Sequence, residues 1–318
     1  MATAAAAPKT LTKRSKTKAV VLTKYGPPEV LVWSDVPMPE PGPGQVRIRV
    51  KASGVSPTDL KIRRGDVKAV FPLASGAVLG FEVAGVVDAL GLSASGVREG
   101  DEVAALLLGL GGYGEHIVAS SWTLKPPNVS WSDAAALPAS AEAAVGILKQ
   151  LRVSRGETLL ILGAGGSVGM IATQLAVSWG VTVIGAASPR DHELVRDLGG
   201  APVIYGAGLA DRVREISPSV DAVLDAAGKG ELPDAISLAG GPARVMTLAD
   251  EHAADLGVAF SAGTPDRAPE ALDQTMPLLA SGALRLRRQR HLRMAEAAEA
   301  HRLLESSEIH EKLVLVAQ

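Results

Sequence analysis

"ETLLILGAGGSVGMIATQLA", Glu157 to Ala176, decides the fold because it holds a strand, a glycine-rich turn and a helix in direct succession. The apolar run before the glycines predicts a buried strand, and the apolar residues after them predict a helix. This succession is typical of a dinucleotide-binding turn, in which glycines let the backbone approach a pyrophosphate. The usual G-x-G-x-x-G pattern does not fit fully, because Val168 holds the third position and Gly169 follows one residue later.

The candidate phosphate ligands are the residues of this turn. Free backbone amides at the start of the predicted helix, aided by the helix dipole, favour a bound anion there. A glycine motif alone is a weak signal, and a turn that binds nothing has the same local pattern. The flanking strand and helix favour the dinucleotide interpretation. The candidates are Gly163, Gly165, Gly166, Ser167, Val168 and Gly169.

The rest of the chain divides into two patterns. After Ser132, predicted strands alternate with predicted helices, which indicates a doubly wound parallel sheet of the Rossmann type. Between Lys18 and Val129 the segments are short and β-rich, as in a small barrel-like domain. A length of 318 residues also exceeds what one hydrophobic core usually serves. We therefore expect an α/β chain of two domains.

The domain boundaries follow from where the pattern changes. Residues 1–17 read as a disordered tail and residues 132–265 as the dinucleotide-binding domain. Ser132 with Asp133 offers an N-cap for the first helix of that domain. The last predicted strand, "EKLVLVAQ", has no βαβ partner after it, so we expect residues 266–318 to complete the domain of residues 18–131. The basic run from Arg285 to Arg293 reads as a solvated connection.

Composition excludes several classes of function. The net charge is −2, so no global field draws the chain to nucleic acid or to a membrane. Only 3% of the residues are aromatic, too few for a protein that binds nucleic acid by base stacking. The absence of cysteine excludes disulfides and thiolate metal sites. No apolar run reaches the roughly 18 residues of a membrane span, and we expect a cytoplasmic protein.

The end of the second predicted Rossmann strand indicates which dinucleotide is bound. A site for NAD usually carries an acidic residue there, which holds the ribose 2′-hydroxyl. This chain has Ser188 at that position and Arg190 beside it, a pair that suits a 2′-phosphate. Tyr205 ends the next strand and either flanks the same phosphate or packs in the core. Gly228 follows a strand at the carboxyl edge of the sheet, where ligands bind. We predict NADPH rather than NADH.

Several motifs, taken in order, resemble one family. "GVSPTDLKIRRG", "VLGFEVAGVV", "GGYGEHIVAS", "LGAGGSVG" and the closing "EKLVLV" are similar to those of the quinone oxidoreductase branch of the medium-chain dehydrogenase/reductase superfamily. The resemblance implies a GroES-like β domain built from both chain ends, a Rossmann domain between them, and often a homodimer. Zinc alcohol dehydrogenases of this superfamily carry Gly-His-Glu where this chain has Gly80-Phe81-Glu82, so the resemblance implies no metal site.

The same resemblance implies reduction of a carbonyl-conjugated C=C bond or of a quinone by hydride transfer. Such a reaction needs a donor near the carbonyl oxygen and a route for a proton. Ser56 stands where many relatives have Asn, and Lys61 is either a second donor or a solvated charge. Tyr113 is either a wall of the cleft or a packed ring. Glu142, on a helix expected to face the nicotinamide, is either a proton donor or a residue that orients its neighbours.

Two alternatives stay open at the level of sequence. One is a biosynthetic tailoring enzyme, an enoyl reductase or reductive cyclase, which keeps the cofactor and takes a bulkier substrate. The other is a regulatory protein that binds NADPH without turnover, since no candidate catalytic residue is compelling by itself. A panel of small enones and quinones separates these from the simple reductase.

Overall fold

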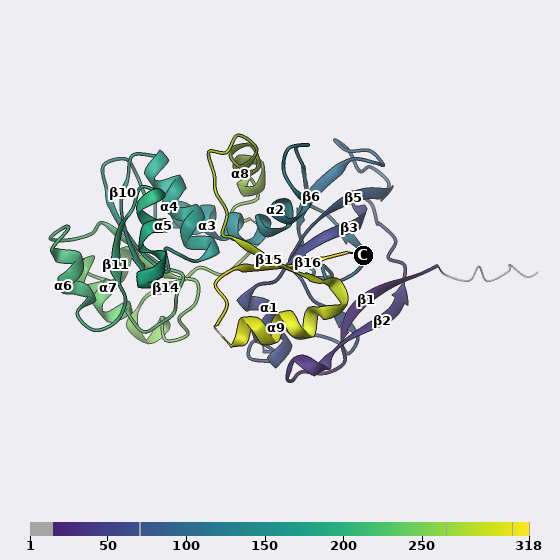
Figure 1. Ribbon diagram of the computed structural model, residues 1–318, viewed down its shortest axis with the longest axis horizontal. Helices are drawn as coiled ribbons and strands as arrows, with labels where there is room; N and C mark the ends of the chain where they lie inside the picture. Colours follow the sequence, from purple (N-terminus) through teal and green to yellow (C-terminus); the bar gives the residue numbers. More distant parts are fainter. Residues whose placement is uncertain (1–14, 70, 265, 307, 318) are drawn as a thin grey trace, which may run out of the picture.

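The computed structural model describes residues 15–69, 71–264, 266–306 and 308–317, which form two lobes (Figure 1). One lobe is built on a six-stranded sheet, and the other on a seven-stranded sheet with a three-stranded sheet beside it. None of the described helices is long and apolar enough to cross a membrane. The expected fold class, a doubly wound α/β sheet with a β-rich second lobe, is confirmed.

The six-stranded sheet is parallel throughout and has the order β11-β10-β9-β12-β13-β14. This is the classic doubly wound order, with its first strand at the centre. Leu159 to Leu162 of that first strand are all buried, because helices cover both faces of the sheet. The strands are β9 (Thr158–Leu162), β10 (Thr182–Ala187), β11 (Ala201–Ile204), β12 (Ala222–Asp225), β13 (Val245–Thr247) and β14 (Ala259–Phe260). The helices are α4 (Ser167–Ser178), η2 (Pro189–Asp191), α5 (His192–Asp197), α6 (Leu209–Arg214) and α7 (Leu232–Leu238).

The other lobe is mainly antiparallel. Val46, Ile48 and Val50 are buried along one strand while Arg49 is exposed, as its period-two pattern predicts. Its strands are β1 (Lys16–Leu22), β2 (Leu31–Pro37), β3 (Val46–Gly54), β4 (Ala77–Val78), β5 (Glu82–Leu90), β6 (Glu102–Leu106), β7 (His116–Ala119) and β8 (Thr123–Leu124), with the helix α1 (Pro57–Arg64). β1 begins at Lys16, inside the stretch expected to be a tail, and residues 1–14 lie outside the described residues.

The C-terminal segment returns to this lobe, as the unpaired last strand predicted. β16 (Lys312–Val316) pairs antiparallel with β3 and parallel with β15 (Gln289–Arg293), and α9 (Ala297–Glu305) lies between them in sequence. Figure 1 shows this yellow segment running through the middle of the molecule. The basic run was expected to be a solvated connection, which is wrong for residues 289–293. They form an edge strand, where charged side chains are tolerated because one side of the strand is open to water.

Two helices link the lobes. α2 (Trp131–Ala136) and α3 (Pro138–Gln150) meet at a proline that takes the first position of α3. The N-cap of α2 is Ser130, whose hydroxyl accepts from Asp133 N at 3.0 Å, so the expected cap at Ser132 is wrong by two residues. One hydrophobic cluster runs from the seven-stranded sheet through α3 and α8 (Ala271–Ala280) to the six-stranded sheet. The domain boundaries at residues 131 and 265 stay a prediction.

Candidate active site

The glycine turn between β9 and α4 is tight and brings the start of the helix close to the end of the strand. Gly163 has a φ of +94°, which favours glycine. α4 begins after Gly166, and no side chain caps its first turn. A Cβ on Gly169 would lie only 2.1 Å from the carbonyl oxygen of Gly163. The late third glycine therefore stands where the helix approaches the end of the strand, and Val168 does not.

The turn after β12 lies directly against this glycine turn. A Cβ on Gly163 would be 3.3 Å from the backbone of Ala226 and Ala227. Gly228, with a φ of +59°, donates its N–H to Asp225 at 3.0 Å and keeps that turn tight. The structure thus brings Gly228 to the edge of the sheet that carries the phosphate candidates.

The residues after β10 form a small polar cluster. The Ser188 hydroxyl donates to the Asp191 carboxylate at 2.7 Å. Asp191 packs against the glycine turn, since a Cβ on Gly165 would be 2.8 Å from it. Arg190 is exposed and contacts the ring of His310, which comes from the other lobe. The sequence interpretation missed Asp191, although an acid four residues past the end of β10 was visible.

Tyr205 lies beside this cluster and is half-buried. The Lys229 Nζ lies 4.5 Å from the centre of its ring. Burial raises the pKa of the Tyr205 hydroxyl to about 12. Tyr205 packs against the hydrophobic cluster of the six-stranded sheet, and its contact with the cofactor stays a prediction.

One further cation reaches the glycine turn, and the sequence interpretation missed it. Arg287 precedes β15 and is half-buried, and its guanidinium donates to the carbonyl oxygens of Gly165 and His310. The expectation that this part of the basic run is solvated is wrong for Arg287. A basic run gives no signal of which member turns inward, because that depends on contacts with a distant segment.

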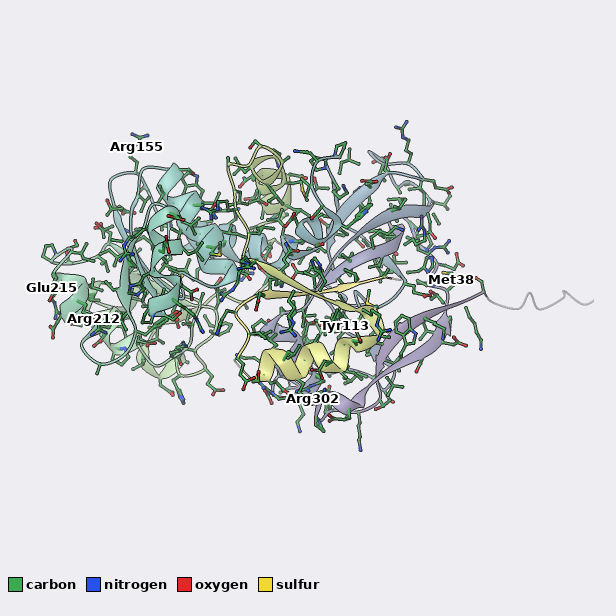
Figure 2. All side chains as sticks on the ribbon, viewed as in Figure 1. Met38, Tyr113, Arg155, Arg212, Glu215 and Arg302 are labelled. Atoms are coloured by element: carbon green, nitrogen blue, oxygen red, sulfur yellow. The ribbon has the colours of Figure 1, made fainter. Side chains whose placement is uncertain are left out.

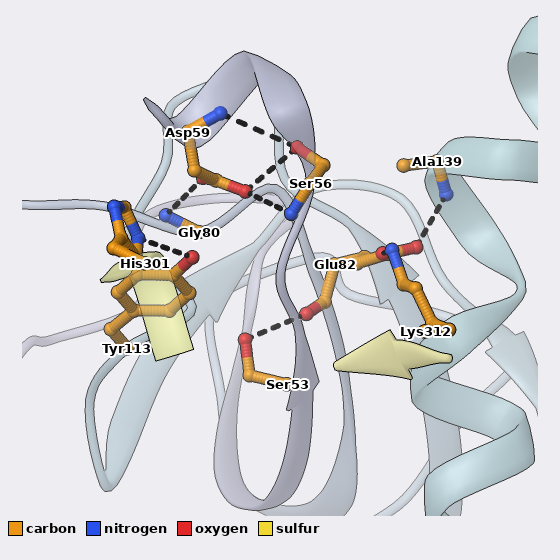
Figure 3. Close-up of polar contacts among 9 residues, drawn as sticks. All are labelled: Ser53, Ser56, Asp59, Gly80, Glu82, Tyr113, Ala139, His301 and Lys312. Carbon is orange, nitrogen blue, oxygen red and sulfur yellow. Dashed lines mark hydrogen bonds and ion pairs between the residues drawn. The ribbon is translucent and has the colours of Figure 1, made fainter. Parts of the chain in front are cut away.

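Ser56 begins α1 and forms a capping box with Asp59. The Ser56 hydroxyl and amide donate to Asp59 Oδ2 at 2.7 and 2.8 Å, and Gly80 N donates to Oδ1 at 3.1 Å (Figure 3). Burial raises the pKa of the Asp59 carboxyl to about 6, with these hydrogen bonds opposing the shift. The carboxylate thereby organises the Ser56 loop. Lys61 follows in the same helix and is half-buried.

Tyr113 lies inside the β-rich lobe and has no exposed surface (Figure 2). Its hydroxyl shares a hydrogen bond of 3.2 Å with His301 Nε2, and the two rings meet edge to face (Figure 3). Burial raises the pKa of Tyr113 and lowers that of His301 to about 3. This environment favours the packed-ring alternative over a wall of the cleft.

Glu142 is buried in α3, and its carboxylate forms an ion pair with Arg267. Arg267 donates from Nε at 2.6 Å and from Nη2 to the same carboxylate, and from Nη1 to Ser261 O at 2.9 Å. A bidentate pair of this kind holds both partners firmly. It fits the alternative in which Glu142 orients its neighbours.

A second buried ion pair joins three elements that the sequence does not connect. Glu82, at the start of β5, is 1% exposed and lies 2.5 Å from Lys312 Nζ of β16. Its other oxygen accepts from Ala139 N of α3 at 2.9 Å (Figure 3). The motif around Glu82 was noted in the sequence, but not its partner.

Comparison with known proteins accounts for this arrangement. A family model described as the alcohol dehydrogenase GroES-like domain matches residues 42–128, and one described as zinc-binding dehydrogenase matches residues 198–315. The chain is 33% identical over 251 residues to a 2-methylene-furan-3-one reductase of Solanum lycopersicum, with 73% of this chain and 63% of that protein covered. A quinone oxidoreductase from Coxiella burnetii superposes with a TM-score of 0.84 at 29% identity, covering 96% of this chain and all of that one.

The chain belongs to the quinone oxidoreductase-like branch of the medium-chain dehydrogenase/reductase superfamily. A mycobacterial protein complexed with NADPH has a TM-score of 0.80 at 26% identity, and the alignment covers 94% of this chain and 99% of that one. In the sequence comparisons, the chain spans less than two thirds of the length of the first curated relatives, 63% and 62%.

Reductases of this superfamily bind a nicotinamide cofactor, and the glycine turn fits one. A side chain at Gly165 would meet Asp191 and one at Gly169 would meet Gly163 O, so both glycines let the turn pack closely. The first turn of α4 carries no side-chain cap, which leaves its amides for an anion. The second family model is named for zinc. In this member of the superfamily the ring of Phe81 packs 6.1 Å from that of Phe71. Over the described part of the chain, no group of three or more potential metal ligands is found.

The buried carboxyl of Asp59 should make stability depend on pH. Its pKa is about 6 in the folded protein, against an ordinary value of 3.8 for an exposed aspartate, so the folded state binds the proton more tightly. Stability therefore falls as pH rises from about 4 to about 6, by about 2–3 kcal/mol from this group. Asp59→Asn should flatten the pH dependence of urea unfolding over that range. Asp211→Asn, at an exposed site, should keep the wild-type slope, and an unchanged slope in Asp59→Asn would contradict the prediction.

Proposed function

We propose that the protein is an NADPH-dependent oxidoreductase that reduces a carbonyl-conjugated C=C bond or a quinone without zinc. The observation that carries the proposal is the glycine turn at Gly163–Gly169, which fits a nicotinamide dinucleotide, in a chain whose relatives are named for these reductions. The substrate is a small molecule, and no net positive charge favours a nucleic acid. The homodimer and the cytoplasmic location stay predictions.

The cofactor, when bound, supplies a hydride. The amides of Ser167 and Val168 would then hold its pyrophosphate at the start of α4. The Gly166 amide donates to Gly163 O at 2.9 Å and keeps the turn closed. Ser56 is the first candidate donor to the substrate's carbonyl oxygen, but its hydroxyl proton is directed at Asp59 in this structure and would have to turn toward the substrate. Lys61, on the same helix, is the second candidate for that contact.

Glu142 and Tyr113 enter the proposal as positioning residues. Glu142 with Arg267 fixes α3 to the loop that carries Ser261. Tyr113 with His301 supports Gly80, since a Cβ on Gly80 would lie 2.7 Å from the Tyr113 ring, and the Gly80 amide holds Asp59. Both side chains are buried and hydrogen-bonded to protein partners, which favours a role in positioning other residues.

The proposal is tested by following reduced-nicotinamide absorbance with a panel of small enones, alkenals and quinones. Turnover on at least one class, abolished when the acceptor is omitted, is the expected result. Tight cofactor binding with slow turnover on every small acceptor would favour a biosynthetic enoyl reductase or reductive cyclase with a larger substrate. Cofactor binding without any oxidation would favour the regulatory alternative and overturn the enzymatic one.

The preference for NADPH is proposed to rest on Arg190. A lost charge-assisted hydrogen bond to a phosphate costs about 1.5–3 kcal/mol, so Arg190→Ala should weaken NADPH roughly 10- to 100-fold and leave NADH unchanged. Intrinsic fluorescence titration with both cofactors measures this, and Arg196→Ala, an exposed arginine of α5, is the control. The neighbouring Asp191 favours NADH instead, because a carboxylate at the end of this strand can accept a hydrogen bond from the ribose 2′-hydroxyl. Equal affinities in the wild type would show that Asp191 prevails.

A further inference from the structure

Arg287 is a cation that the proposed mechanism does not yet use. It lies between α8 and β15, in the C-terminal segment that belongs to the seven-stranded sheet, yet its guanidinium reaches the glycine turn of the other lobe. The hydrogen bonds that the structure gives this group run to the carbonyl oxygens of Gly165 and His310 and not to a carboxylate. A cation held only by neutral acceptors keeps its charge available for an anion.

The backbone on either side of Arg287 is fixed. The side-chain amide of Gln174, on α4, donates to Arg285 O at 2.9 Å and accepts from Arg285 N at 2.7 Å. Three residues past Arg285, Lys312 N donates to Arg288 O at 2.8 Å. Arg287 is thus carried by a short segment anchored to the very helix whose N-terminus it faces. A pre-positioned side chain loses less conformational entropy on binding a ligand.

The guanidinium of Arg287 lies at the start of α4, where the side chains are closely packed. The residues around this point are Ala136, Ser167, Ile171, Leu286, Arg287 and Lys312. Charged groups and one phenol, those of Asp191, Arg190, Tyr205 and Glu311, lie close enough to affect the charge of the guanidinium. Burial lowers the pKa of Arg287 from its usual value, but a guanidinium remains charged at any physiological pH.

Its position favours the pyrophosphate over the 2′-phosphate. Arg287 bonds Gly165 O, and its Nη1 lies 3.9 Å from a Cβ placed on Gly166, the N-cap of α4. The amides of that N-cap region are the groups that hold a pyrophosphate in this fold. Arg190, by contrast, follows β10, where the 2′ substituent of the ribose is read.

We propose that Arg287 is a ligand of the cofactor's pyrophosphate, delivered to the Rossmann lobe by the C-terminal segment of the other lobe. The inference rests on the proposed function, because it requires a dinucleotide in the Gly163–Gly169 turn. It adds that affinity depends on both lobes, and that NADPH and NADH depend on Arg287 alike. Arg287 thereby contributes to the affinity for either dinucleotide, and Arg190 to the preference for NADPH over NADH.

The test compares Arg287→Leu and Arg287→Lys with Arg288→Leu, which removes the same charge from an exposed neighbour. Dissociation constants for NADPH, NADH and ADP are measured by calorimetry, and unfolding midpoints without ligand report on folding. Arg287→Leu should weaken NADPH, NADH and ADP by one common factor of roughly 10–100. Arg287→Lys should fall between, and Arg288→Leu should bind as the wild type does.

Three results would overturn the inference. Unchanged affinity in Arg287→Leu would make the residue a structural contact only. Weakening of NADPH alone would make it a ligand of the 2′-phosphate. A loss of affinity shared equally by Arg288→Leu would reduce the effect to net charge. A wild-type protein that binds neither dinucleotide would instead overturn the proposed function, so the two failures are distinguishable.

Discussion

Lys312→Met is expected to lower the free energy of unfolding by about 3–5 kcal/mol, the cost of leaving a buried charge without its partner. Glu82 is 1% exposed, and its side chain is held by Lys312 Nζ at 2.5 Å and by Ala139 N at 2.9 Å. After the substitution only the amide of Ala139 remains of these two contacts. The loss is measured by urea unfolding at neutral pH.

The control is a surface pair of similar geometry. Lys149 lies 2.6 Å from Glu270, but both side chains are more than a third exposed, so Lys149→Met should cost less than about 1 kcal/mol. The double variant Lys312→Met with Glu82→Gln removes both charges and should recover part of the loss. A double variant as unstable as the sum of the two single variants would contradict the buried-charge explanation.

Gly169→Ala is expected to destabilise the protein by about 3 kcal/mol, at the upper end of what overpacking usually costs. A Cβ at this position would lie 2.1 Å from Gly163 O and 2.7 Å from Ala164 Cα, which are backbone atoms that cannot swing aside. Relief requires α4 to move away from β9. That movement also widens the glycine turn, so cofactor affinity should fall with stability.

Gly109→Ala is the matched control, because no heavy atom lies within 4 Å of its Cβ position. It should leave the unfolding midpoint and the affinity for NADPH near their wild-type values. Gly169→Ala with full stability would show that the helix has room for a methyl group. Packing between helix and strand would then not explain why the third glycine stands at position 169 and not at 168.

The fold of the Rossmann half was largely predictable from sequence because its signals are local. Apolar runs, glycines and helix starts each depend on neighbours within a few residues, and β9, α4 and β10 appear where those patterns placed them. The third glycine, one residue later than in the usual pattern, still lies where helix and strand approach each other closely, at Gly169. The cap of α2 was misplaced because Ser130 and Ser132 both precede an acid within reach, and only the backbone conformation selects one.

The polar partners in and around the candidate site were not predictable, and the reason is their separation along the chain. Glu82 and Lys312 lie 230 residues apart, Tyr113 and His301 188, Glu142 and Arg267 125, and Arg287 and Gly165 122. The residues next to a single Glu, Arg or His in the sequence do not indicate which distant residue it will pair with.

The sequence by itself determined the doubly wound sheet and the glycine turn, because periodicity and turn chemistry act over a few residues. The tertiary structure alone decided which charges are buried and paired, that Tyr113 is packed inside, and that Arg287 faces the glycine turn. Those outcomes depend on contacts between segments far apart in the chain. Burying a charged side chain is costly unless it is paired, and here the partner comes from a distant segment.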